Sequence, residues 1–130
     1  MDVIEVASQR RRQLVDVTSF VQEAVAASGV SQGICHVAVP HTTAGVLLNE
    51  NADPAVGDDI LAALVAMLPS IAWRHSEGNS DAHVLSTVVG HSVTIPISES
   101  ELALGRWQAV YLLELDGPRR RELWITCVGG

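Results

Sequence analysis

The segment from Asp53 to Pro69 constrains the fold more than any other part of the chain. Asp53 is a residue type that caps helices, and Pro54 suits the first helical position, where its missing N–H is not needed. Apolar residues then recur on one helical face: Val56, Ile60, Leu61, Leu64, Val65 and Leu68. The spacing predicts an amphipathic helix over residues 54–68, with one face packed against the rest of the protein.

Short alternating or apolar segments around this helix predict β-strands. These segments are 3–6, 13–17, 33–40, 44–48, 91–97, 107–115 and 121–128. We expect the first two to form a hairpin, and the last two to form another around Asp116, Gly117 and Pro118. A further helix is predicted at 19–28, and a short one at 82–89, capped by Asp81. This order predicts an α+β fold: a single compact domain over residues 1–130, whose mainly antiparallel or mixed sheet is covered by helices.

The charge of the chain argues against several partners and reactions. Its 15 acidic and 8 basic residues give a formal net charge of -7, which disfavours binding to nucleic acid or to an anionic membrane. Every basic residue is Arg, so Schiff-base chemistry and a phosphate-loop lysine are excluded. The first twelve residues do not have the pattern of a secretory signal. We therefore expect a cytoplasmic location and reduced thiols at Cys35 and Cys127.

The apolar content is high for a chain of this length. Apolar residues make up 48% of the 130 positions, and the mean hydropathy is +0.26. An excess of this kind points to apolar faces shared between subunits. Small Ala and Val residues supply much of this excess. The alternative interpretation is that they lie in the core of a single chain.

A polar segment at residues 74–83 concentrates groups that can carry chemistry. It holds a cation, two imidazoles, two carboxylates and an amide: Arg74, His75, Glu77, Asn79, Asp81 and His83. Lone-pair donors of these kinds can converge on a divalent metal ion. The spacing matches no standard metal motif, however, and a solvated polar loop explains the same residues equally well.

A second candidate group follows the predicted strand 33–40. His41 comes directly before Thr42 and Thr43, at a strand end of the kind that often meets ligands; the alternative is a histidine with a local hydrogen bond. Glu50 can bind metal, act as a general base or lie in solvent. Asp53 has a sufficient structural task as a helix cap.

Two further sets of side chains could contact a substrate. Hydroxyl groups can donate hydrogen bonds to a phosphate, and they stand at Thr42, Thr43, Ser86 and Thr87. Trp107 and Gln108 place a large flat ring beside an amide, which suits a ring-bearing ligand, although a Trp in a core or an interface is the commoner case.

Four strings of the sequence are similar to the YjbQ family, also called UPF0047 and often named secondary thiamine-phosphate synthase. They are HTTAGVLLNENADP at 41–54, HSEGNSDAH at 75–83, LGRWQ at 104–108 and ELDGPRRR at 114–121. The resemblance implies a compact α+β domain that assembles as a homotrimer. It also implies a His-lined site for a divalent metal, zinc, with magnesium as the alternative for pyrophosphate chemistry. The implied side activity joins a pyrimidine pyrophosphate to a thiazole phosphate and releases pyrophosphate, which gives thiamine phosphate.

Carried over position by position, the resemblance assigns roles to single residues. The implied metal ligands are His41, His75 and His83, and the implied catalytic groups are Glu50, Glu77 and Asp81. The implied substrate contacts are Thr42, Thr43, Asn49, Asn79, Ser86, Trp107 and Gln108. One position departs from the family: Leu85 stands where many relatives have Lys, so a phosphate contact from that lysine is absent, with Arg74 or Arg106 as substitutes.

Three functions are therefore open. The first is a metal-binding enzyme with thiamine-phosphate synthase activity, which the lack of Lys favours as a side reaction rather than the main one. The second is a metal-dependent hydrolase of a small phosphorylated metabolite, in which the metal activates water. The third is a non-catalytic trimer that binds a metabolite or a metal.

Overall fold

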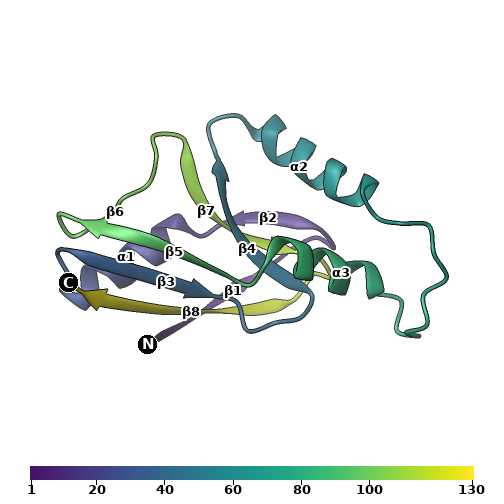
Figure 1. Cartoon of the computed structure of the whole chain (residues 1–130), viewed down its shortest axis with the longest axis horizontal. Coiled ribbons are helices and arrows are strands. Elements are labelled where there is room, and N and C mark those ends of the chain that lie inside the picture. The colour runs from purple at the N-terminus through teal and green to yellow at the C-terminus, as the bar shows by residue number, and fades with distance from the viewer.

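Eight strands divide into two antiparallel sheets in the computed structural model, which covers residues 1–130 (Figure 1). The larger sheet has the order β1-β8-β3-β5-β6. Its strands are β1 (Asp2–Ala7), β8 (Arg120–Gly129), β3 (Gly33–Ala38), β5 (Ser92–Ser98) and β6 (Glu101–Leu102). The smaller sheet has the order β2-β7-β4, with β2 (Gln13–Asp16), β7 (Gln108–Glu114) and β4 (Ala44–Glu50). The near-continuously apolar segment predicted as strand 33–40 contains the middle strand of the larger sheet.

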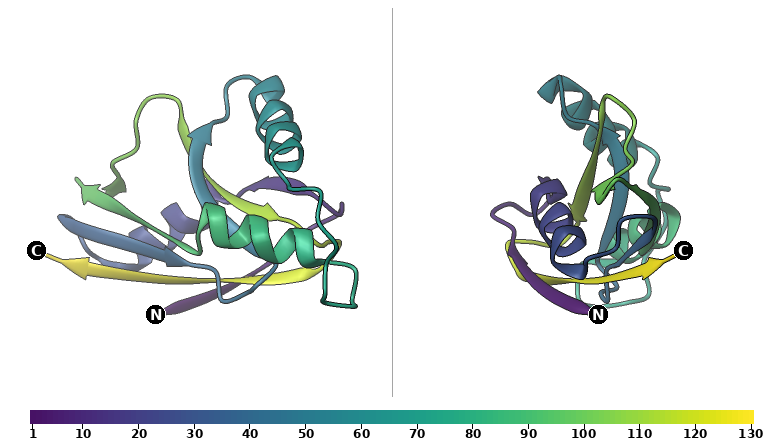
Figure 2. Two further views of the ribbon diagram at one scale, coloured as in Figure 1. Left: turned by 45° about the vertical axis from the view of Figure 1, so that its right-hand side comes forward. Right: turned by 90° about the vertical axis from the view of Figure 1, so that its left-hand side faces the viewer.

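Three helices complete the fold: α1 (Thr18–Ser28), α2 (Pro54–Ala66) and α3 (Ser80–Val89). Helix α1 buries Val21, Ala24 and Val25 against the sheets. Helix α3 lies along β4, and α2 stands at the rim of the molecule, away from α1 (Figure 2). None of the three has the length and apolar character that crossing a membrane takes.

The core lies between the two sheets and under α1. Its main cluster joins inward side chains of β3, β4, β5, β7 and β8 to those of α1. A smaller cluster forms where α3 meets β7, from Ala82, Leu85, Leu113 and Leu115. Strand β7 thus buries both faces, which explains its unbroken apolar sequence. The predicted single compact α+β domain is confirmed.

The predicted helix at 54–68 is confirmed as α2, which ends two residues earlier. The Asp53 side chain accepts a hydrogen bond from the Ala55 N–H at 2.9 Å, and Pro54 occupies the first turn. Leu61 and Leu64 on the expected face pack against the smaller core cluster. No residue of α2 is fully buried, however, so this apolar face is only half covered within one chain.

Both predicted hairpins are wrong. Strand β1 pairs with β8 and β2 pairs with β7, so the chain changes sheets at residues 8–12 and again at 115–119. These two crossings bind each other: the Ser8 N–H donates to the Arg119 carbonyl and the Gly117 N–H to the Arg11 carbonyl, both at 2.9 Å. A Cβ at Gly117 would lie 2.3 Å from the Arg10 carbonyl oxygen, so the close approach requires glycine. The turn residues indicated that the chain reverses direction, but they did not indicate which strands pair with each other.

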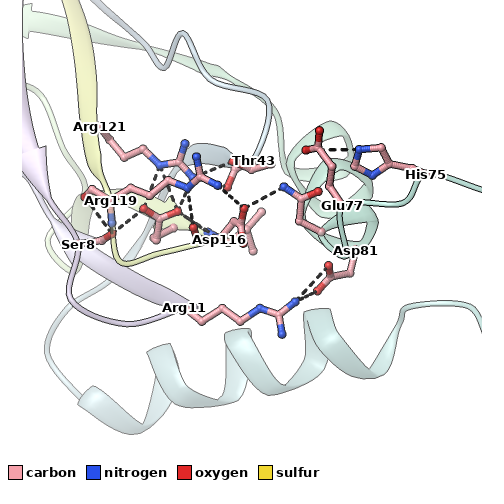
Figure 3. A network of polar contacts seen from close by, with 12 residues as sticks. Ser8, Arg11, Thr43, His75, Glu77, Asp81, Asp116, Arg119 and Arg121 are labelled. Atoms are coloured by element: carbon pink, nitrogen blue, oxygen red, sulfur yellow. Dashed lines mark hydrogen bonds and ion pairs between the residues drawn. The ribbon is translucent and has the colours of Figure 1, made fainter. Parts of the chain in front are cut away.

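Asp81 is not the cap of the third helix. Helix α3 begins at Ser80, after Asn79, and ends at Val89 as predicted. The Asp81 carboxylate instead accepts a hydrogen bond from Arg12 at 2.6 Å. It also accepts longer hydrogen bonds from Arg11, at 3.4 and 3.3 Å (Figure 3). This contact ties the start of α3 to the first sheet crossing.

Candidate functional site

An all-polar cleft opens where the β3–β4 loop, the start of α3 and the start of β8 meet. Its volume is about 350 Å³. Apart from Pro40, it is lined by His41, Thr42, Thr43, Glu77, Asn79, His83, Arg119 and Arg121. Six of these eight are residues that the sequence analysis singled out. Segments far apart in the chain therefore meet in one place.

A buried ion pair forms the floor of the cleft. The Arg121 side chain is 4% exposed and that of Glu114 is fully buried. Arg121 Nε donates to both Glu114 oxygens, at 2.9 and 3.1 Å. Its Nη2 donates to the carbonyl and the hydroxyl of Thr43, at 3.0 and 2.8 Å. The pair therefore fixes the β3–β4 loop as well as the guanidinium (Figure 3).

Glu114 is held in its ionised form. Burial alone would raise the pKa of its carboxyl, but hydrogen bonds from Arg121, Ser8 and the Asp116 N–H outweigh burial and hold that pKa below its usual range. The Ser8 hydroxyl donates to Oε1 at 2.6 Å. The floor is thus a full salt bridge with its oxygens satisfied by donors.

A second guanidinium stands at the wall of the cleft. Arg119 Nη2 donates to Asp116 Oδ2 at 2.7 Å, and the same oxygen accepts from Asn79 Nδ2 at 2.9 Å. Burial opposes ionisation of Asp116, but these two donors lower its pKa. Neither Arg119 nor Arg121 uses its Nη1 in a hydrogen bond within the chain. Each therefore keeps charge-assisted donors for a ligand.

His41 adds a donor to the same cleft. Its Nε2 accepts a hydrogen bond from the Glu122 N–H at 2.8 Å. Burial lowers the pKa of the imidazole, and the nearby Arg121 lowers it further. A neutral imidazole whose Nε2 accepts carries its proton on Nδ1. His41 is therefore a neutral hydrogen-bond donor above its lowered pKa.

The His41 arrangement predicts a pH effect on stability. The folded pKa lies below the unfolded value of 6.5, so the unfolded state binds the proton first and the free energy of unfolding falls as pH drops below about 6.5. In His41→Gln, whose side-chain oxygen can still accept from Glu122, this decline is smaller. Urea unfolding between pH 5 and 8 measures it, with the exposed His91→Gln as control. Equal declines in all three proteins would contradict the assignment.

Helix α3 and the loop before it place the other two histidines. The His75 and His83 rings meet edge to face with centroids 5.4 Å apart. His75 Nδ1 lies 3.0 Å from the Ser80 hydroxyl, and its Nε2 lies 3.7 Å from Glu77 Oε2. His83 and Glu77 line the cleft, whereas His75 does not. Glu77 is thus the one predicted catalytic carboxylate at the cleft.

The three histidines do not fit one metal ion as they stand. No group of three His, Cys, Asp or Glu side chains is arranged to hold a metal. The Nε2 lone pair of His41 is already used by the Glu122 N–H, and its Nδ1 carries the proton. The metal site implied by the family resemblance stays a prediction.

A second group of predicted residues lies at the far end of β4. Glu50 pairs with Gln108 in the sheet, whereas Ala44, next to Thr43, pairs with Glu114. Six residues of extended strand separate these ends by about 20 Å. Asn49, Trp107 and Gln108 therefore do not line the cleft.

Glu50 borders a separate cavity of about 330 Å³ with Asp16, Asp53 and Tyr111. Burial raises the pKa of the Tyr111 hydroxyl, and the carboxylates of Asp16 and Glu50 raise it further. The Tyr111 hydroxyl donates to the Glu50 carbonyl at 3.2 Å. Within one chain, Glu50 cannot complete a site that contains His41.

Ser86, a predicted substrate contact, and Leu85, the departure from the family, both have structural tasks. Ser86 is buried, and its hydroxyl donates to the Thr42 carbonyl at 2.6 Å, so it tethers the cleft loop to α3. Leu85 belongs to the smaller core cluster. The cations of the cleft come instead from Arg119 and Arg121, not from Arg74 or Arg106.

Arg119 and Arg121 were not predicted as site residues from the sequence. In the structure Arg120 faces Glu5 on the surface, while its two neighbours bind Asp116 and Glu114. The available signal was alternation within β8, which exposes Arg120 and buries Arg121.

Comparison with known proteins places the whole chain in one family. The family model described as "UPF0047 protein YjbQ-like" matches residues 2–130. The chain belongs to the YjbQ/UPF0047 family. A UPF0047 protein of Methanocaldococcus jannaschii is 45% identical over 127 residues, which are 96% of this chain and 91% of the relative. The UPF0047 protein YugU of Bacillus subtilis is 36% identical, over 99% of both chains.

Solved structures of the YjbQ/UPF0047 family share this fold. A crystal structure of an uncharacterised family protein from Clostridium acetobutylicum has a TM-score of 0.94 and 41% identity, and covers 98% of this chain and 100% of its own. A YjbQ-like protein of unknown function from Sulfolobus solfataricus has a TM-score of 0.93 and 36% identity, over 99% and 96% of the two chains.

Proposed function

We propose that the cleft binds the phosphate or pyrophosphate group of a small metabolite. The unpaired Nη1 groups of Arg119 and Arg121, beside the neutral His41, carry the proposal. Guanidinium groups bind phosphate oxygens through charge-assisted hydrogen bonds. Each cation is matched by a carboxylate behind it, so the cleft offers directed donors rather than a large excess of positive charge.

The family resemblance names the reaction we propose for this site. The thiazole nitrogen forms a bond to the methylene carbon of the pyrimidine, the carbon–oxygen bond to pyrophosphate breaks, and that oxygen keeps the electron pair. Negative charge develops on the leaving pyrophosphate, and we expect Arg119, Arg121 and the His41 N–H, which line the same cleft, to stabilise it. Glu77, at the cleft, is the proposed catalytic carboxylate, and Asn79 and Thr42 are proposed substrate contacts.

Incubation with the two precursors tests the reaction. The wild-type protein should form thiamine phosphate, detected by chromatography, with an equal amount of pyrophosphate. Arg119→Gln should slow formation at least about tenfold, because a charged hydrogen bond contributes about 1.5–3 kcal/mol. Glu23→Gln, which alters an exposed carboxylate of α1 outside the cleft and outside the predicted site residues, should keep the wild-type rate. If the wild type forms no product but still binds pyrophosphate, the transferase proposal is rejected and the protein is a binding protein.

The alternatives from the sequence are separated by the same assay. A hydrolase would release phosphate from a single precursor without the second. A non-catalytic protein would bind precursor in stoichiometric amount without turnover. The predicted zinc ligands are tested by comparing the metal content of the wild type, His75→Ala and His83→Ala, each purified without added metal.

We also propose that the chain forms a homotrimer and acts in the cytoplasm. The half-covered face of α2 and the exposed side chains of Met67, Ile71 and Trp73 support assembly, because exposed apolar surface on this scale favours burial between subunits. Multi-angle light scattering of the purified protein tests the trimer, and a monomer mass would reject it.

A further inference from the structure

Two cysteines face each other across the middle of the larger sheet. Cys35 of β3 stands directly opposite Cys127 of β8 in the antiparallel register. The Gly130 N–H donates to the Gln32 carbonyl at 2.9 Å, and these two residues lie one step beyond the Gly33–Gly129 pair. Hydrogen-bonded and non-hydrogen-bonded pairs alternate in such a ladder. Counting from this bond, Cys35 and Cys127 form a non-hydrogen-bonded pair.

This pair type brings side chains closest together. Opposite Cα atoms of a non-hydrogen-bonded pair are about 4.5 Å apart, within the range of about 4.4–6.8 Å that a disulfide spans. Both thiols are free. The register therefore places them within the usual span of a disulfide.

The two thiols differ in access and reactivity. Cys35 is fully buried in the main core, and burial together with Cys127 raises its pKa to about 12. Cys127 is half-buried and borders a cavity of about 250 Å³ beside Asp2 and Ser28. A small oxidant therefore reaches Cys127 first.

We propose that Cys35 and Cys127 are a covalent modification site that a small organic disulfide converts into a cross-strand disulfide. The Cys127 thiolate attacks one sulfur of the reagent, which forms a mixed disulfide and expels one reagent thiolate. The Cys35 thiolate then attacks Cys127 Sγ, forms the intrachain bond and expels the second thiolate. Two protein thiols are oxidised and one reagent disulfide is reduced to two thiols.

The order of attack makes the two single variants behave differently. With 2-hydroxyethyl disulfide as the probe, the mass of the intact wild-type chain should fall by two hydrogen atoms, with no reagent retained. Cys35→Ser should keep one reagent group on Cys127. Cys127→Ser should stay unmodified, because the remaining thiol is buried and protonated. In the wild type, the rate of intrachain disulfide formation should rise about tenfold per pH unit, because the fraction of Cys35 in the thiolate form rises by the same factor.

Three results would overturn the proposal. They are a wild-type chain that retains the reagent or does not react, disulfide-linked dimers in place of the intrachain bond, and modification of Cys127→Ser as fast as that of Cys35→Ser. Circular dichroism of both variants confirms that they are folded before the reaction. Dithiothreitol should restore the original mass of the oxidised wild type.

Discussion

Replacing Glu114 with leucine should lower the free energy of unfolding by about 3–5 kcal/mol, the usual cost of removing one partner of a buried ion pair. Glu114 is fully buried, and its loss leaves the Arg121 guanidinium buried without a counter-ion. The carbonyl and hydroxyl of Thr43, held by the same guanidinium, then lose their fixed donor. Guanidinium chloride unfolding at pH 7 measures the effect.

A matched surface pair provides the control. Glu5 lies 3.9 Å from Arg120, and both side chains are exposed, so Glu5→Leu should change stability by less than about 1 kcal/mol. The double variant Glu114→Leu with Arg121→Met should recover part of the loss, because it leaves no buried charge. A loss of the same size at Glu5 and Glu114 would contradict the role of the buried pair.

Acid should weaken both ion pairs of the cleft, that of Glu114 at its floor and that of Asp116 at its wall. The folded-state pKa of Glu114 and that of Asp116 lie below their ordinary values of 4.5 and 3.8. Their contribution to stability is therefore complete above those values and is lost as pH falls through the lower folded-state pKa values.

Arg119→Gln should weaken binding of inorganic pyrophosphate by about 10- to 100-fold. Nη1 of Arg119 makes no bond within the chain and lines the cleft wall, so its removal takes away a charged hydrogen bond worth about 1.5–3 kcal/mol. That energy corresponds to the stated loss of affinity. Isothermal titration calorimetry at fixed ionic strength measures it.

Arg106→Gln is the matched control for charge. Arg106 stacks over the Trp107 ring, with its Cζ 4.8 Å from the ring centroid, and both residues lie outside the cleft. The two variants lose the same formal charge, so a general electrostatic effect would weaken both alike. Equal affinity in the wild type and Arg119→Gln would contradict the assignment of this arginine.

Local patterns were sufficient for elements that stabilise themselves locally. The Asp53 cap, Pro54 and a 3.6-residue apolar period define α2, and each acts within one or two turns. Strand pairing depends on contacts between residues far apart in the sequence. The sequence of each strand in the two predicted hairpins did not indicate which strand it pairs with. Thus β1 pairs with β8, more than 110 residues away.

The candidate site shows the same division. His41 and His83 could be selected from sequence, because polar groups next to apolar segments are visible there. Glu50 was grouped with His41 because they share one string, yet an extended strand carries it about 20 Å away. Arg121 was missed because an arginine triplet at a turn resembles solvated surface. Only the three-dimensional structure, in which the end of β7 meets the start of β8, shows that Glu114 and Arg121 are buried together.

Diffraction from crystals grown with inorganic pyrophosphate tests the central claim most directly. We expect density for pyrophosphate in the cleft, with its oxygens within hydrogen-bond distance of Arg119 Nη1, Arg121 Nη1 and His41 Nδ1. Pyrophosphate at the cavity beside Glu50, or a vacant cleft at a concentration that saturates binding in calorimetry, would contradict it.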